Sequence, residues 1–135
     1  MFKKIAGLLA LTFLASSLAV AQEDTTAAVS VNIDQILFGT GIESREAIGV
    51  DTVFTADVGN VYCWVLATGA EGETQISFVW YHGDEQVAEV NVPVRSARWR
   101  CWTSKTIMPD MTGTWKVEIK DEAGKVLESA SFQVK

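Results

Sequence analysis

From position 34 to the C-terminus, apolar residues occur in short runs between turn-forming residues, and no stretch has the period of an amphipathic helix. The clearest alternation is in residues 114–121, where Trp115, Val117 and Ile119 face one side and charged residues face the other. Such alternation is typical of a strand with one buried face. The hydrophobic pattern therefore predicts a protein built from β-strands.

Seven segments have this character, and each is bounded by glycine, proline or acidic turn residues. The first is irregular because Gly39 and Gly41 interrupt it, and Pro93 marks a strand edge or end because proline cannot donate to a ladder. Residues 51–59 remain ambiguous between a strand end and a turn. The predicted strands are residues 36–48, 61–68, 74–82, 86–94, 98–107, 114–121 and 126–134.

About seven antiparallel strands with hairpin-length connections, within about 100 residues, are typical of an immunoglobulin-like β-sandwich. A lipocalin-type barrel would need an eighth strand and a longer chain. We therefore expect an all-β fold, a sandwich of about seven antiparallel strands that forms a single domain over residues 34–135. Residues 22–33 carry few large apolar groups and are expected to form a flexible N-terminal segment.

The first 21 residues have the three parts of a secretory signal peptide in the usual order. Lysines stand at positions 3 and 4, a mainly apolar run spans positions 5–18, and the small residues Ala-Val-Ala follow. We expect cleavage between Ala21 and Gln22 and a periplasmic or secreted product with no stable membrane insertion. The alternative is an uncleaved membrane anchor, for which the apolar run is short.

The charge of the chain limits its partners. Cleavage removes two of the eleven basic side chains and none of the seventeen acidic ones, which leaves nine against seventeen and a net charge near −8. An acidic protein repels nucleic acid, so we expect no nucleic-acid partner. The exception is a local basic group that could hold an anion, formed by Arg95, Arg98, Arg100 and Lys105.

The two cysteines of an exported domain are most simply paired in a disulfide. In an immunoglobulin-like order the strands at 61–68 and 98–107 are neighbours, so Cys63 and Cys101 could face each other across the ladder. A bond closing a loop of this size stabilises the fold by about 4 kcal/mol on the chain-entropy model. The alternative is a pair of buried free thiols.

If the cysteines share a face, alternation assigns each remaining residue of these two strands to one face or the other. The side that carries Cys63, Cys101 and Trp99 has no charge and is expected to be the core face. The opposite side combines large rings with guanidinium groups, which suits a binding surface. The alternatives are arginine–tryptophan stacking that only shields the sheet, or a register that buries Trp64. The predicted binding residues on the outer face are Tyr62, Trp64, Arg98, Arg100 and Trp102.

Enzyme motifs and metal-ligand spacings are missing from the sequence. The single histidine, His82, lies at a predicted hairpin end beside Asp84 and Glu85, where a polar turn residue is expected. Acidic residues at loop positions lack EF-hand spacing. We therefore expect no enzyme activity, no metal site and no cofactor.

Several segments together resemble a bacterial family known as domain of unknown function 2914. They read FTADVGNVYCW, VWYHGDE, PVRSARWRCWTSK and GTWKVEIKDEAGKVL, and the resemblance extends over residues 41–134. Cys101 and Thr103 depart from the usual pattern. The resemblance implies a small β-rich module of exported or membrane-attached bacterial proteins. It implies no reaction, ligand or catalytic residue.

Tryptophan, tyrosine and arginine are the residues enriched at binding hot spots. Four of the five tryptophans and both tyrosines fall within residues 62–102. We therefore expect an exported, non-catalytic interaction module that binds an envelope protein or an anionic ligand through its aromatic and arginine-rich face. The alternative is a carbohydrate-binding module for a cell-wall or extracellular glycan.

Overall fold

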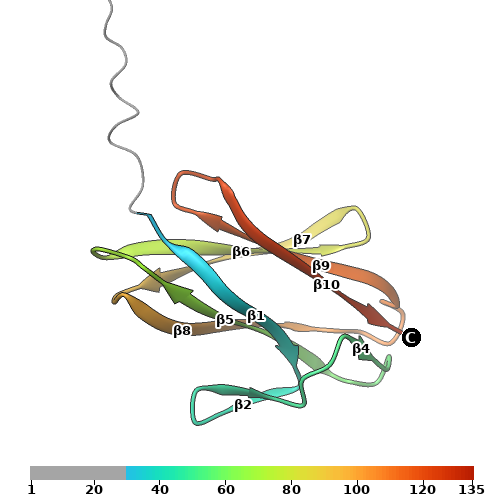
Figure 1. Ribbon diagram of the computed structural model, residues 1–135. Helices are drawn as coiled ribbons and strands as arrows, with labels where there is room; N and C mark the ends of the chain where they lie inside the picture. Colours follow the sequence, from blue (N-terminus) through green and yellow to red (C-terminus); the bar gives the residue numbers. More distant parts are fainter. Residues whose placement is uncertain (1–29) are drawn as a thin grey trace, which may run out of the picture.

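The computed structural model describes residues 30–135, and all of its regular secondary structure is β (Figure 1). The predicted signal peptide and residues 22–29 of the predicted flexible segment lie outside the described residues. Between residues 30 and 135 there is no helix with the length and apolar character needed to cross a membrane.

Two antiparallel layers and one small hairpin make up the fold (Figure 1). The first layer is a three-stranded sheet in the order β1 (Asn32–Gly39), β5 (Asn60–Thr68), β8 (Arg98–Thr106). The second has five strands in the order β4 (Val53–Phe54), β10 (Val126–Val134), β9 (Gly113–Asp121), β6 (Thr74–His82), β7 (Glu85–Val94). Only the short β4 pairs in parallel. The hairpin consists of β2 (Gly41–Glu43) and β3 (Glu46–Ile48).

The predicted all-β sandwich is confirmed, with ten strands in place of about seven. Six long strands, β5 to β10, match predicted segments, and β6 and β10 have the predicted bounds. The difference lies in the predicted strand at 36–48, which is divided into β1, β2 and β3, and in the short β4 within 51–59. β1 also begins at Asn32, inside the segment expected to be flexible.

The first predicted strand is divided at Gly39, where the backbone passes too close to Ile48 for a side chain. A Cβ atom added to Gly39 would lie 2.4 Å from the carbonyl oxygen of Ile48. The Thr40 N–H donates to that same oxygen at 2.9 Å. The chain therefore turns back on itself after β1, and the β2–β3 hairpin lies on the outer side of the three-stranded sheet (Figure 1).

Phe132 on β10 is the centre of the core between the two sheets. Its ring contacts four aromatic neighbours at centroid distances of 4.6–6.3 Å, and it is 1 % exposed. The inward positions predicted from alternation on β9 are all fully buried. The four aromatic neighbours are Phe38, Phe54, Trp80 and Trp115.

One buried hydrogen bond connects the two sheets through the core. The indole N–H of Trp80 on β6 donates to the hydroxyl of Thr103 on β8 at 3.0 Å. Burying an indole N–H without a partner would be costly, so this bond fixes how β8 lies over β6.

β7 and β8 are the outermost strands of their sheets on the same side of the sandwich. Only residues 95–97 connect them, so the two free edges lie along one flank. Pro93 on β7 removes one edge donor, as its position in the sequence predicts. This flank positions the candidate site.

Candidate functional site

The predicted assignment of faces on β5 and β8 agrees with the observed burial. Cys63 and Val65 are fully buried and Cys101 is 5 % exposed, so the cysteine-bearing face is the core face. On the opposite side Arg98 is exposed, and the side chain of Arg100 is 34 % exposed. The two arginines therefore lie on the outer face, as expected.

Trp64 corrects the predicted binding surface. It lies on the outer face of β5 but is only 2 % exposed, because the β2–β3 hairpin covers it. Its indole N–H donates to the carbonyl oxygen of Arg45 at 2.9 Å. Leu66, two positions along the strand, is 3 % exposed. Trp64 therefore anchors the hairpin and cannot contact a ligand.

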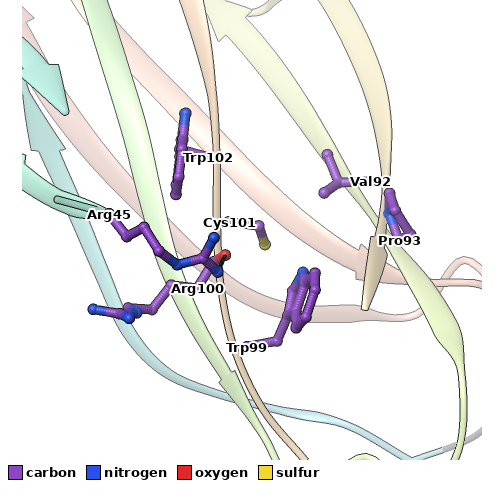
Figure 2. Close-up of a pocket in the computed structure, with 7 residues that line it drawn as sticks. All are labelled: Arg45, Val92, Pro93, Trp99, Arg100, Cys101 and Trp102. Atoms are coloured by element: carbon purple, nitrogen blue, oxygen red, sulfur yellow. Dashed lines mark hydrogen bonds between the residues drawn. The ribbon is translucent and has the colours of Figure 1, made fainter. Parts of the chain in front are cut away.

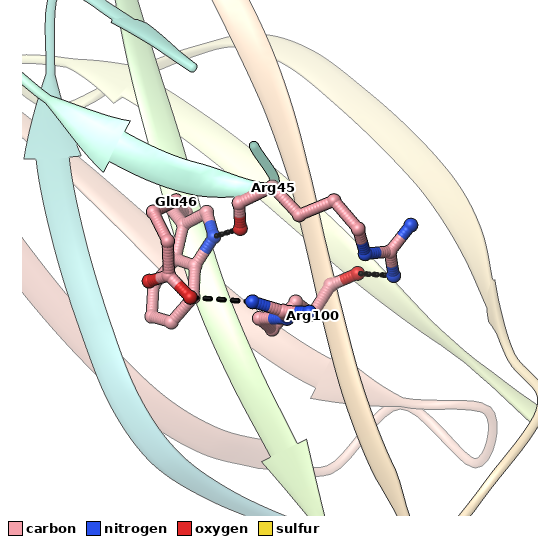
Figure 3. A network of polar contacts seen from close by, with 4 residues as sticks. Arg45, Glu46 and Arg100 are labelled. Atoms are coloured by element: carbon pink, nitrogen blue, oxygen red, sulfur yellow. Dashed lines mark hydrogen bonds and ion pairs between the residues drawn. The ribbon is translucent and has the colours of Figure 1, made fainter. Parts of the chain in front are cut away.

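Arg45 is the site residue that the sequence did not reveal. Its guanidinium carbon lies 5.8 Å from the ring centroid of Trp99 and 5.9 Å from that of Trp102. One guanidinium nitrogen donates to the carbonyl oxygen of Arg100 at 3.4 Å, a long and weak hydrogen bond (Figure 3). A cation at this distance from two indole rings makes favourable cation–π contacts.

The turn that carries Arg45 is strained. Ser44 and Arg45 have φ values of 51° and 67°, and they are the two non-glycine residues between 30 and 135 with positive φ. Such a two-residue hairpin turn ordinarily uses asparagine and glycine. A left-handed conformation costs about 1–2 kcal/mol for an ordinary residue. The contacts of the hairpin with Trp64 and β8 must compensate for this strain.

Arg100 joins the hairpin to β8 through an ion pair. Its guanidinium lies 2.5 Å from a carboxylate oxygen of Glu46 on β3 (Figure 3). Both side chains are partly exposed, so the pair contributes at most about 1 kcal/mol. Arg100 thus has a carboxylate partner within the protein, whereas the guanidinium of Arg45 is hydrogen-bonded only to a carbonyl group among the described residues.

A hollow opens on the flank between β7 and β8, and we call it the flank hollow (Figure 2). Its volume is about 210 Å³, smaller than the roughly 300–1,000 Å³ of typical small-molecule sites. It has room for one side chain or one small anionic group. Its lining residues are Arg45, Val92, Pro93, Trp99, Arg100, Cys101 and Trp102.

The five predicted binding residues are only partly brought together. Arg100 and Trp102 line the flank hollow, and Trp64 lies beneath the hairpin. Tyr62 is half-buried on β5, opposite Ser104, and does not line the hollow. Arg98 is exposed at the start of β8, also outside it. The site is therefore displaced from the sheet face to the sheet edge.

The predicted disulfide is not present in the structure, where Cys63 and Cys101 are free. Cys63 pairs with Thr103 across the ladder, and Cys101 pairs with Val65. The two cysteines share a face but are offset by two positions, so neither lies opposite the other. Burial raises the pKa of Cys63 well above its ordinary value, and the nearby Cys101 raises it further. Burial also raises the pKa of Cys101, to about 12, although the nearby Arg45 opposes the shift.

We expect these thiols to make stability fall at alkaline pH. Because the folded pKa exceeds the ordinary value of 9.0, the thiols stabilise the fold below about pH 9, and this contribution is lost as the pH rises toward about 12. The slope is at most about 1.4 kcal/mol per pH unit for each thiol. Urea unfolding of the reduced protein at several pH values should show a steeper decline than the double variant Cys63→Ala, Cys101→Ala. A mass spectrum of unreduced protein that shows a Cys63–Cys101 bond would contradict the free pair.

His82 has a packing role. Its ring stacks on Trp115 at 4.6 Å with an interplanar angle of 22°, and its Nε2 lies 2.7 Å from the carbonyl oxygen of Thr112. These contacts hold the end of β6 against the loop before β9. Among residues 30–135, no group of three histidine, cysteine or acidic side chains is arranged to hold a metal ion.

The fold and the site define a β-sandwich domain with a small aromatic and basic hollow at one flank. Residues 73–134 match the family described as "Protein of unknown function (DUF2914)", which confirms the predicted resemblance to this family. The match covers β6 to β10 and so includes the β7 and β8 walls of the hollow. Arg45 and Trp64 precede the matched segment, which is shorter than the resemblance at 41–134. No curated protein matches the chain significantly.

Proposed function

We propose that this protein is an exported, non-catalytic binding module that engages a partner protein through the flank hollow and the adjoining edge of β8. The observation that carries the proposal is the placement of Arg45 between Trp99 and Trp102 at the mouth of the hollow. Tryptophan and arginine in a partly desolvated depression are the usual composition of a binding hot spot.

The chemistry of the other reactive side chains supports a non-catalytic role. Both thiols are buried with raised pKa values, which disfavours the nucleophilic thiolate. The imidazole of His82 is engaged in packing and in a hydrogen bond. The flank hollow contains no acidic side chain among its lining residues. A positioned base beside a nucleophile, the usual requirement for covalent catalysis, is not part of this arrangement.

A carbohydrate ligand is the alternative, and the geometry favours it less. Sugars bind to tryptophan through an exposed ring face. Here the guanidinium of Arg45 lies near both indole rings that border the hollow. A protein partner with an anionic group uses the same cation directly, because a carboxylate accepts two parallel hydrogen bonds from a guanidinium.

Site-specific photo-crosslinking in cells that make the protein tests this proposal. A photoreactive phenylalanine at Ser104, which is exposed on β8, should give a covalent adduct with another protein. The same residue at Ser129, exposed on β10, is the matched control and should give none. Equal labelling from both positions, or none from position 104, would remove the flank as a binding surface.

A further inference from the structure

The outer edge of β8 has backbone groups that no other strand pairs with. β8 is the last strand of its sheet and is hydrogen-bonded to β5 alone. The Ile107 N–H donates to the carbonyl of Gly59, and the Gly69 N–H donates to the carbonyl of Ala97. The backbone N–H and C=O groups of the odd-numbered residues of β8 therefore point toward β5. In an antiparallel pair the alternate residues point their N–H and C=O groups away. On β8 these are Arg98, Arg100, Trp102, Ser104 and Thr106.

Side chains occupy only the first part of this edge. The carbonyl of Arg98 accepts a hydrogen bond from the Ser96 hydroxyl at 2.9 Å, and that of Arg100 accepts one from Arg45. The edge from Trp102 onward has no such cover among the described contacts. A free edge of this kind is a template for an added strand.

Charge selects which strand could be added. All four arginines of this acidic chain lie on β8, next to it in the β7–β8 connection, or over it from the hairpin turn, and Lys105 is also on β8. Arg45 is exposed and has no carboxylate partner among the described residues. An acidic segment is attracted here, whereas a basic one is repelled. Pairing of two copies edge to edge would bring the arginines of both β8 strands together, which disfavours a second copy of this chain as the occupant.

The hairpin holds Arg45 in place at the cost of backbone strain. Trp64 binds the Arg45 carbonyl, and Glu46 pairs with Arg100, so both sides of the turn are fixed to the sheet. Edge strands are commonly protected from aggregation by charged side chains, most often lysine. Arg45 instead lies against the rings of Trp99 and Trp102 at the mouth of the hollow.

Resting on the proposed function, we propose that the ligand is an extended acidic segment of a partner protein. It adds as a strand to the edge of β8 from Trp102 onward, and one of its carboxylates is bound by Arg45. Side chains of the added strand alternate between the two faces. One apolar side chain therefore reaches the flank hollow beside Val92 and Trp99.

Binding of short blocked peptides, measured by isothermal titration or fluorescence anisotropy, tests the proposal. The probe alternates valine with glutamate, and its counterparts carry lysine for glutamate or proline at alternate valines. We expect the glutamate peptide alone to bind, with affinity falling as salt rises. Arg45→Ala should weaken binding about tenfold or more, and Arg45→Lys should restore only part of it because the planar fork is lost. Equal binding of the lysine or proline peptide would overturn the proposal.

A proline in β8 separates strand addition from simple charge attraction. Ser104→Pro removes an outward N–H that β5 does not use, so the fold should tolerate it as edge strands tolerate proline. We expect at least a tenfold loss of peptide affinity. The matched control is Glu89→Pro on the β7 edge. Alternation gives Glu89 the same backbone orientation as Pro93, so its N–H also points outward, and the affinity for the peptide should stay unchanged.

The outcomes of these experiments can be told apart. Undiminished binding by folded Ser104→Pro protein would overturn strand addition, and the proline peptide provides the same test if the variant does not fold. Crosslinking at position 104 without binding of the glutamate peptide would overturn the acidic-strand proposal and leave the proposed function standing. Sedimentation can also show concentration-dependent dimers. If the peptide does not dissociate them, the occupant of the edge is a second copy of this chain, and the acidic-strand proposal is overturned.

Discussion

Phe132→Ala is expected to remove about 3–5 kcal/mol of unfolding free energy, which is much of the total for a domain of this size. The ring is 1 % exposed and contacts four other aromatic rings, which come from both sheets. Its removal leaves a cavity that these rigid neighbours cannot collapse to fill. Urea unfolding followed by tryptophan fluorescence measures the loss as a lower midpoint.

A matched control comes from the same strand. Val126 is 47 % exposed at the start of β10, so Val126→Ala should change the unfolding free energy by about 0.5 kcal/mol or less. A loss below about 1 kcal/mol for Phe132→Ala would mean that the aromatic cluster repacks around the missing ring. It would contradict the view that this cluster holds the two sheets together.

The strands were predictable because each long strand has its own local signal. Alternation on β9 identifies Trp115, Val117 and Ile119 as core residues, and all three are fully buried. Glycine and proline mark where strands end, because they affect the backbone directly. These signals depend on neighbours in the sequence, so they can be read without knowing the rest of the fold.

Cross-strand register was only half predictable. A strand has a side-chain period of two, so alternation decides which face a residue occupies. A slip of two positions leaves every residue on the same face, and alternation cannot detect it. Cys63 and Cys101 were therefore placed correctly on the core face, but the predicted pairing between them is replaced by pairing with Thr103 and Val65.

The β2–β3 hairpin was the feature that the sequence could not supply. Its turn at Ser44 and Arg45 lacks the glycine or asparagine that usually marks such a turn. Its packing on Trp64 and Arg100 joins residues that are 19 and 55 positions apart from Arg45. Both the burial of Trp64 and the presence of Arg45 in the site follow from this packing.

Trp64→Ala is expected to cost about 3 kcal/mol or more and to detach the hairpin from the sheet. The indole is buried beneath the hairpin, and its N–H donates to the Arg45 carbonyl. The strained turn then has little to keep it in place. Trypsin should cleave the bond after Arg45 in the folded variant but not in the wild-type protein. Trp64→Phe keeps a ring but leaves that carbonyl unbonded, so a smaller loss of about 1 kcal/mol is expected.

A control variant must separate a general loss of stability from a specific release of Arg45 from the sheet. Val79→Ala truncates a fully buried residue on β6, a strand of the other sheet, and should lower stability while the bond after Arg45 stays protected. If Trp64→Ala also leaves that bond protected, the hairpin is held by Arg100 and Glu46 instead of by the indole. If cleavage appears, Trp64 is not the ligand contact that the sequence suggested but holds Arg45 in position at the mouth of the flank hollow.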